Sequence, residues 1–302
     1  MSRRLLLILA FLAWPRAVLR AQVTGDLRID ELRSEVFHNT RKVRVWLPPG
    51  YDDPANRERT YPVLYLNDGQ NVFDAKTALF GPHEWRADET ATDLVRRGAI
   101  PPLVIVGIDD AGRRGRAHEY LPWPDRYLQP PEPHPEGDRY GDFLAREVLP
   151  FVEARYRVSR DPDGRALGGS SYGALVALRV AELHPGLFTR LLLESPSFYV
   201  DDDHVLRALD PSTLRLDRVY LGVGTNELGR DGCPDGNEGN AEAVYGVERA
   251  ATLLARAGLQ PGSGLQVTVE KCGEHGEEAW ARRLPRALTF LFGGPPDRSS
   301  GR

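Results

Sequence analysis

This sequence has few of the residues and motifs from which metal and nucleotide sites are built. Its 302 residues include only two cysteines, and it contains neither an H-E-x-x-H pattern nor a C-x-x-C pair. A structural or catalytic zinc is therefore not expected. A Walker A motif and a Rossmann glycine pattern are also missing, which argues against nucleotide chemistry. The run Asp201-Asp202-Asp203-His204 could suggest a metal, but acidic residues favour helix starts, so we expect it to cap a short helix.

The chain also has no large excess of charge of one sign and no apolar run of membrane-spanning length. Its net charge is −4, and its arginines are scattered, so we expect no nucleic-acid partner. The apolar run at residues 5–14 is too short to cross a bilayer. Two arginines precede it and small residues follow, which is the layout of a secretory signal peptide. We therefore predict a signal peptide at residues 1–21 and an exported mature protein without an integral membrane span. A retained short anchor is the alternative.

The composition is that of an ordinary globular protein, with 41% hydrophobic and 27% charged residues. From residue 62 onward the expected strands alternate with helices, which predicts an α/β fold with a mostly parallel sheet and helices on both faces. We expect a single domain at residues 22–292, then a loose tail at 293–302. Residues 109–137 are expected to form a long connection. The expected strands are 26–36, 43–47, 63–66, 103–108, 165–167, 188–193, 218–223 and 265–269, and the expected helices are 87–97, 139–156, 172–183, 240–257 and 277–292.

The most informative motif is Gly169-Ser170-Ser171-Tyr172-Gly173, which reads G-x-S-x-G. It lies between an apolar strand and a helix-forming run, the setting of the nucleophile elbow in α/β-hydrolases. Because this turn is strained, the residues two before and two after the nucleophile must be small. Ser171 has glycine at both positions, whereas Ser170 would have Tyr172 at the second. Ser171 is therefore the predicted nucleophile, and a glycine-rich turn with a helix-capping serine is the alternative.

A serine nucleophile needs a base, and the base needs an orienting acid. In α/β-hydrolases the chain order is serine, acid, histidine. His275 is the predicted base because it alone among the histidines follows the last expected strand. Glu227 directly follows the strand at 218–223 and is the favoured acid. Asp231 and Asp235, in the same loop, are alternatives.

The two cysteines lie beside these residues. Cys233 is in the loop of the proposed acid, and Cys272 is three residues before His275. In an oxidising compartment they could form a disulfide, which would fix the two loops together. Two free thiols are the alternative.

An oxyanion hole requires two backbone N–H donors. One is expected from Tyr172 and the other from the loop at residues 67–73. There Gly69 lets the backbone turn inward, and the N–H of Gln70 is the favoured donor. A plain Asn-Asp-Gly turn is the alternative.

Taken together, these segments resemble the esterase D and enterochelin-esterase-like family of α/β-hydrolases. The matching segments are residues 64–74, 104–109, 118–122, 168–173, 224–227 and 273–275, with Trp280. The resemblance spans roughly residues 26–292. The sequence departs from the family at Asn67, where many members have histidine, and in a longer loop after Glu227.

The resemblance implies a serine carboxylesterase that works through an acyl-enzyme without a metal or an organic cofactor. Family members act on siderophore esters, acylated or feruloylated sugars and simple acyl esters, so we expect a small-molecule or carbohydrate ester as the partner. From their positions in or beside the long connections, Trp85, Trp123 and Tyr127 could line an acyl or aryl pocket; ordinary loop packing is the alternative. An acyltransferase with a sugar or alcohol acceptor is one alternative, and a non-catalytic binding protein on a hydrolase scaffold is another. No oligomeric state is predicted.

Overall fold

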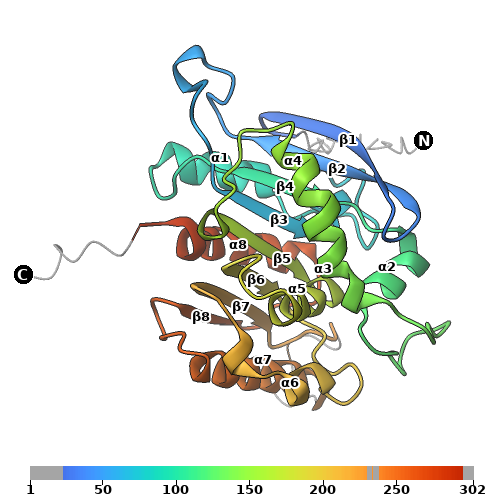
Figure 1. The fold of residues 1–302 in the computed structure, drawn as a ribbon. Helices are drawn as coiled ribbons and strands as arrows, with labels where there is room; N and C mark the ends of the chain where they lie inside the picture. Colours follow the sequence, from blue (N-terminus) through green and yellow to red (C-terminus); the bar gives the residue numbers. More distant parts are fainter. Residues whose placement is uncertain (1–22, 230–232, 234–237, 295–302) are drawn as a thin grey trace, which may run out of the picture.

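A computed structural model describes residues 23–229, 233 and 238–294, so the expected signal peptide and most of the expected tail lie outside the described residues. These residues form one eight-stranded sheet in the order β1-β2-β4-β3-β5-β6-β7-β8 (Figure 1). Strand β1 pairs antiparallel with β2, and β2 with β4, while all other neighbours are parallel. The prediction of a mostly parallel sheet is confirmed. The strands are β1 (Asp26–Ser34), β2 (Asn39–Leu47), β3 (Val63–Asn67), β4 (Val104–Ile108), β5 (Arg165–Ser170), β6 (Arg190–Glu194), β7 (Arg218–Gly224) and β8 (Leu265–Glu270).

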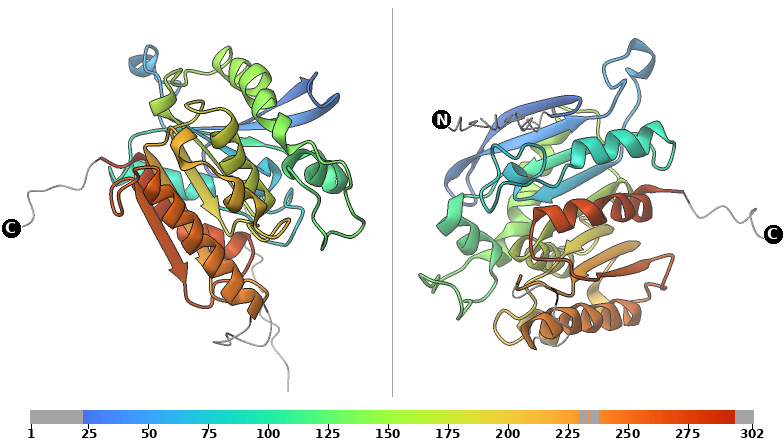
Figure 2. Two further views of the ribbon diagram at one scale, coloured as in Figure 1. Left: turned by 60° about the horizontal axis from the view of Figure 1, so that its bottom comes forward. Right: turned by 180° about the vertical axis from the view of Figure 1, so that it is seen from behind.

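Helices cover both faces of the sheet, as predicted. Helices α1 and α8 lie on one face, seen in front in the right-hand view of Figure 2, and the others lie on the opposite face. The helices are α1 (Ala87–Arg96), α2 (Gly112–Tyr120), α3 (Tyr140–Phe143), α4 (Leu149–Glu153), α5 (Tyr172–Leu183), α6 (His204–Ala208), α7 (Glu238–Arg256) and α8 (Glu277–Phe292). None of the described helices is both long enough and apolar enough to cross a membrane.

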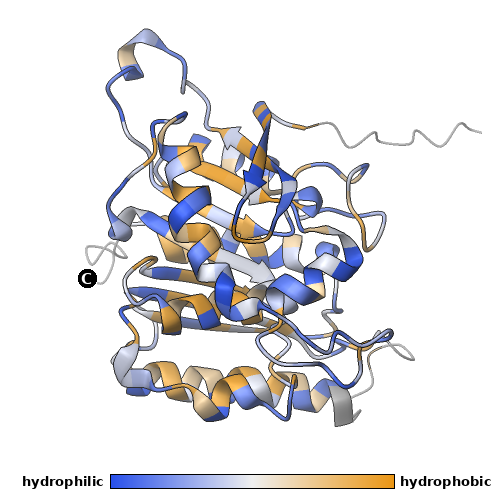
Figure 3. Cartoon of the chain, turned by 45° about the vertical axis from the view of Figure 1, so that its right-hand side comes forward, coloured by the Kyte–Doolittle hydropathy of each residue, from blue (hydrophilic) through white to orange (hydrophobic). Residues whose placement is uncertain are grey.

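The alternation of side chains along each strand produces two hydrophobic cores. In β3, Val63 and Tyr65 pack into the core beneath α3, α5 and α7, whereas Leu64 and Leu66 pack into the core beneath α1 and α8. A strand buried on both faces reads as a continuous apolar run. Figure 3 shows hydrophobic colouring on inner strands and in patches along the helices. The sheet is therefore packed on both faces, and the helices on each side hold the loops that connect the strands.

The structure differs from the sequence prediction most clearly in two helical segments. Helix α2 lies within the long connection expected at residues 109–137. Its glycines are unfavourable in helices, so the sequence pattern did not indicate a helix there. Burial of four side chains stabilises it, those of Arg116, Ala117, Glu119 and Tyr120. The helix expected at 139–156 is α3 and α4 joined by a π-helical turn at Leu144–Val148, just before Pro150. Helix α8 has the expected bounds, although Pro285 lies inside it.

Candidate active site

The candidate residues gather at the carboxyl edge of the parallel strands, where α/β folds place their ligand sites. Ser171 follows β5, Glu227 follows β7 and His275 follows β8. All three line one pocket of about 460 Å³. The order of the strands thus brings together three residues that span more than a hundred positions of the sequence.

Ser171 lies at the tight turn between β5 and α5. Its backbone has φ 56° and ψ −125°, a strained conformation for a residue with a side chain. A Cβ on Gly169 would lie 2.8 Å from the carbonyl carbon of Gly173, and one on Gly173 would lie 3.1 Å from Cβ of Asn67. The two glycines of the motif are therefore required by the close approach of the chain to itself.

The imidazole of His275 is held by Glu227. Its Nδ1 lies 2.7 Å from Oε2 of Glu227, and Glu227 Oε1 accepts hydrogen bonds from the Gly224 amide at 2.6 Å and from the Ser195 hydroxyl at 2.8 Å. Burial acts to raise the pKa of Glu227, but the hydrogen bond and charge of His275, with the two other donors, lower it overall. Because an ionised carboxylate only accepts, Nδ1 carries the hydrogen and Nε2 is left free to accept a proton.

Ser195, at the end of β6, was not identified from the sequence. Its hydroxyl accepts from the indole Nε1 of Trp280 at 2.9 Å and from Nη2 of Arg283 at 3.3 Å. Both are donors only, so the Ser195 hydrogen must point to Glu227. Its φ of 42° is a second strained position. Its place directly after a buried strand does not by itself distinguish it in the sequence.

The hydroxyl of Ser171 contacts another serine. Its Oγ lies 3.0 Å from Oγ of Ser197, which is buried. Within the part of the chain that the structure describes, Ser171 makes no hydrogen bond to His275. The structure therefore brings Ser171, Glu227 and His275 to one pocket, but joins directly only the last two.

The loops that carry Glu227 and His275 are fastened to one another. The predicted disulfide between Cys233 and Cys272 is present, with an S–S distance of 2.07 Å. A Cβ on Gly224 would lie 1.9 Å from the carbonyl oxygen of Gly273, so the two backbones touch where glycine allows it. Thr225 adds a hydrogen bond, accepting at 2.9 Å from the amide of Cys272. The alternative acids Asp231 and Asp235 lie outside the described residues.

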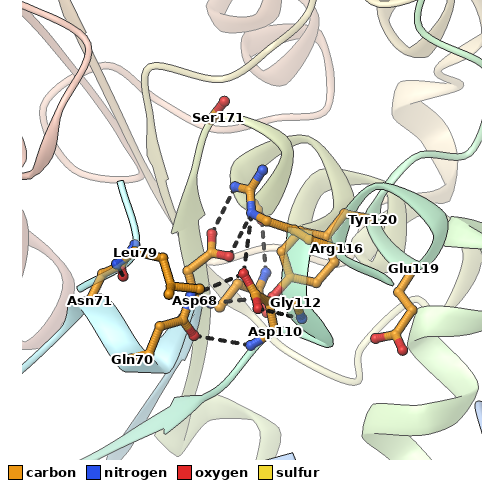
Figure 4. Close-up of polar contacts among 12 residues, drawn as sticks. Asp68, Gln70, Asn71, Leu79, Asp110, Gly112, Arg116, Glu119, Tyr120 and Ser171 are labelled. Carbon is orange, nitrogen blue, oxygen red and sulfur yellow. Dashed lines mark hydrogen bonds and ion pairs between the residues drawn. The ribbon is translucent and has the colours of Figure 1, made fainter. Parts of the chain in front are cut away.

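The loop after β3 is held in place by buried charged side chains from α2 and from the segment after β4. Arg116 on α2 forms a two-pronged ion pair with Asp68, at 2.6 and 2.8 Å, and its guanidinium lies 5.3 Å from the ring of Tyr172. The side chain of Gln70 bonds Asp110 at 3.0 Å and is turned away from Ser171 (Figure 4). Burial, with the nearby charge of Asp68, raises the pKa of Asp110 to about 6.

The two expected oxyanion donors are on the turns that flank the nucleophile. Tyr172 is the first residue of α5, and Gln70 lies in a 3-10 turn, Gly69–Asn71. Among the described residues, neither backbone amide finds a hydrogen-bond acceptor. Asn67 ties the two turns together: its Nδ2 donates to the Gly173 carbonyl at 2.8 Å, and its Oδ1 accepts from the hydroxyl of Tyr140.

Two expectations about side chains near the pocket are met only in part. Of the three aromatic residues suggested for it, Tyr127 lines the pocket, whereas Trp85 is buried against Trp280 and Trp123 stacks on His204 at 4.0 Å. Asp203 precedes α6 but does not cap it through its side chain, because its carboxylate pairs with Arg249 instead. No group of three or more metal-ligating side chains occurs in the described residues.

Comparison with known proteins decides the family. A family model described as "Putative esterase" matches residues 34–291. The chain belongs to this esterase family. Among its relatives, the uncharacterized protein YbbA of Bacillus subtilis is 24% identical over 277 residues, which are 86% of this chain and 96% of YbbA. The iron(III) enterobactin esterase of Dickeya dadantii is 30% identical over 173 residues, which are 57% of this chain and 34% of that protein.

Solved structures agree on the architecture of this esterase-family protein. A ferulic acid esterase aligns with a TM-score of 0.63 and 22% identity, covering 88% of this chain and 98% of its own. At that identity the likeness shows the fold alone. The fold is that of an α/β-hydrolase, as the sequence predicted.

Proposed function

We propose that this protein is a serine carboxylesterase with Ser171 as nucleophile, His275 as general base and Glu227 as orienting acid. The observation that carries the proposal is the 2.7 Å contact between His275 Nδ1 and Glu227 in the pocket that also holds Ser171 on its strained turn. A buried, ionised carboxylate on Nδ1 fixes the tautomer in which Nε2 can take a proton. Membership of an esterase family supports the same chemistry.

The reaction begins when the Ser171 hydroxyl turns from Ser197 toward His275. Its Oγ attacks the ester carbonyl carbon while Nε2 of His275 takes the hydroxyl proton. The oxyanion of the tetrahedral intermediate is stabilised by the backbone amides of Tyr172 and Gln70. The intermediate collapses to an acyl-enzyme, and the alcohol leaves with the proton from His275.

The second half of the reaction repeats these steps with water. His275 takes a proton from a water molecule, whose oxygen attacks the acyl carbon and forms a second tetrahedral intermediate. Collapse breaks the bond to Ser171 Oγ, which regains its proton from His275, and the carboxylic acid leaves. Glu227 stays ionised throughout and stabilises the imidazolium that forms twice in each cycle.

The cellular setting and the domain limits are also proposed. The disulfide between Cys233 and Cys272 supports export, because such bonds persist mainly in oxidising compartments. We propose an exported protein whose residues 22–292 are a single catalytic domain, following a signal peptide at 1–21 and ending in a loose tail at 293–302.

The ester itself is proposed only as a class. The names of relatives point to two kinds of ester, because one acts on iron(III) enterobactin and one structural neighbour is a ferulic acid esterase. An acyltransferase would use the same acyl-enzyme with a sugar or alcohol as acceptor. Adding an alcohol and measuring the ratio of new ester to free acid separates the two activities.

The decisive experiment measures hydrolysis of p-nitrophenyl acetate and butyrate by the mature chain and by Ser171→Ala. We expect the variant to lose roughly 10³-fold or more in kcat. Ser197→Ala is the matched control, because it removes the neighbouring hydroxyl and should keep activity within about tenfold. Equal rates for the parent and Ser171→Ala would exclude Ser171 as the nucleophile. Ligand binding without any turnover would favour the non-catalytic alternative.

A further inference from the structure

The pocket beside Ser171 extends away from the nucleophile toward helix α7. Three aromatic side chains line it, those of Tyr127, Phe198 and Tyr199, and Ala243 and Gly246 line it from α7. Tyr127 and Tyr199 meet edge to face with their ring centroids 5.9 Å apart. The volume of about 460 Å³ is in the range of small-molecule sites. Such a space is large enough for a substrate group well beyond an acetyl.

Gly246 is the most informative residue of this pocket. It lies in the interior of α7 (Glu238–Arg256), where glycine is less favourable than every residue except proline. Neither the backbone nor close packing requires it, because a Cβ there would meet only Phe198, at 3.5 and 3.7 Å, which is ordinary van der Waals contact. A longer side chain would press on Phe198 and enter the pocket. Local structure therefore does not explain the glycine, and its effect is to leave open space in the pocket.

The charges around the pocket are acidic. Asp203 and Glu242 both line it, and no lysine or arginine is among its described lining residues. Asp203 is paired with Arg249. Glu242 is exposed and has no ion-pair partner in the part of the chain that is described. Its uncompensated charge repels anions and leaves neutral groups unaffected.

We propose that this pocket is a subsite for an uncharged aromatic ring of the ester substrate, that Gly246 admits the ring, and that Glu242 discriminates against anionic rings. The subsite rests on the proposed function of Ser171. Aromatic rings pack edge to face or offset on other rings, and Phe198, Tyr199 and Tyr127 offer such surfaces. Gly246 provides room for the ring against α7.

The test compares Gly246→Leu and Gly246→Ala with the parent on two matched pairs of esters. Methyl 3-phenylpropanoate and methyl butanoate differ by a ring on the acyl side, and benzyl acetate and butyl acetate by a ring on the alcohol side. We expect Gly246→Leu to lower kcat/KM for the ring-bearing ester of at least one pair by roughly tenfold or more. The ringless esters should change less than about twofold, and Gly246→Ala should stay close to the parent. Equal losses on ringed and ringless esters, or none on either, would overturn the subsite.

Binding provides a readout that does not depend on turnover. The affinity of Ser171→Ala for methyl 3-phenylpropanoate and for benzyl acetate is measured by calorimetry, with and without Gly246→Leu. We expect the added leucine to weaken the better of the two ligands by roughly tenfold, and unchanged binding of both would refute the subsite. If the parent hydrolyses nothing, or Ser171→Ala still hydrolyses, the proposed function fails, and this binding result still decides the subsite. Thermal unfolding of each variant confirms that it is folded.

The charge selectivity has its own pair of substrates. Methyl 3-(4-methylphenyl)propanoate is neutral, and methyl 3-(4-carboxyphenyl)propanoate carries a carboxylate on the same ring. We expect the parent to favour the neutral ester by roughly two- to fivefold, the range for one exposed charge, and Glu242→Gln to narrow this ratio by raising the rate on the anionic ester alone. Added salt should narrow it too, because the charge of Glu242 is exposed. A parent that prefers the anionic ester, or a ratio that Glu242→Gln leaves unchanged, would contradict the proposal.

Discussion

Replacing Ser195 by alanine removes one hydroxyl that joins Glu227 to helix α8. The change deletes the 2.8 Å hydrogen bond to Glu227 and leaves the indole N–H of Trp280, now 2.9 Å from that hydroxyl, without its acceptor. A hydrogen bond to a charged group contributes about 1.5 to 3 kcal/mol, and a buried donor without a partner costs about 1 to 3 kcal/mol. Because the two contributions overlap rather than add, we expect the free energy of unfolding to fall by about 2 to 4 kcal/mol.

The same change has a separate effect on catalysis. Glu227 keeps its contacts with His275 and the Gly224 amide, so kcat should fall only about tenfold, which is about 1.4 kcal/mol of barrier. The carboxylate also loses a donor and becomes a stronger acceptor. The protonated imidazole of His275 is then stabilised, and the acid limb of the pH profile of kcat should move to higher pH.

Urea unfolding and the pH profile of kcat measure the two effects, with the exposed Ser263→Ala as the control that should change neither. A loss of stability with an unmoved acid limb would reduce Ser195 to a structural role and refute the reasoning. An unchanged stability would mean that the indole N–H of Trp280 finds another acceptor.

Three further predictions concern other contacts of the site. Glu227→Gln should lower kcat by about 10³-fold or more. Folding lowers the pKa of Glu227. Its ionisation therefore stabilises the fold fully above the unfolded pKa near 4.3, and this stabilisation is lost as pH falls through the folded pKa. Thermal unfolding at decreasing pH should show this loss of stability for the parent and not for Glu227→Gln. Replacing Cys233 and Cys272 together by serine opens a cross-link between residues 39 positions apart and should cost about 4 kcal/mol of stability in urea unfolding, together with some kcat; an unchanged kcat would show that the glycine contact alone aligns the loops. Arg116→Met leaves the buried carboxylate of Asp68 without its ion-pair partner and should lower the free energy of urea unfolding by about 3 to 5 kcal/mol; a variant as stable as the parent would show that Asp68 finds other donors.

The elements that the sequence predicted best are those with strong local signals. Helices at 172–183 and 277–292 have the bounds expected, because an elbow glycine and a glycine before a charged first turn mark where they begin. The disulfide was predictable because the chain order of the proposed acid and base placed both cysteines at one edge of the sheet.

The elements that were missed depend on partners distant in the sequence. Helix α2 has poor helix formers, and its stability comes from burial and from the ion pair of Glu119 with Arg41, 78 residues away. Ser195 has no local pattern that distinguishes it, since its importance comes from Trp280, 85 residues later. Glu242 and Gly246 could not be assigned to a pocket before the place of α7 relative to β6 was known. Local periodicity can find elements, but it cannot find contacts between them.

The carboxyl ends of β6, β7 and β8 are cross-linked around the proposed acid and base. The ends of β6 and β8 are joined through Arg283, which pairs with Glu194 at 2.7 Å and with Glu270 at 2.7 Å. The ends of β7 and β8 are joined by the disulfide and by the contact of Gly224 with Gly273. Glu227 and His275 therefore form a rigid unit with the carboxyl ends of three strands. Ser171, directly after β5, donates its backbone N–H to the Glu194 carbonyl at 3.0 Å, and its hydroxyl contacts Ser197. In the proposed mechanism, rotation of the Ser171 side chain away from Ser197 brings the hydroxyl to His275. Substitutions at Ser197 should therefore alter the rate of acylation, within the roughly tenfold given above, more than the position of the acid limb.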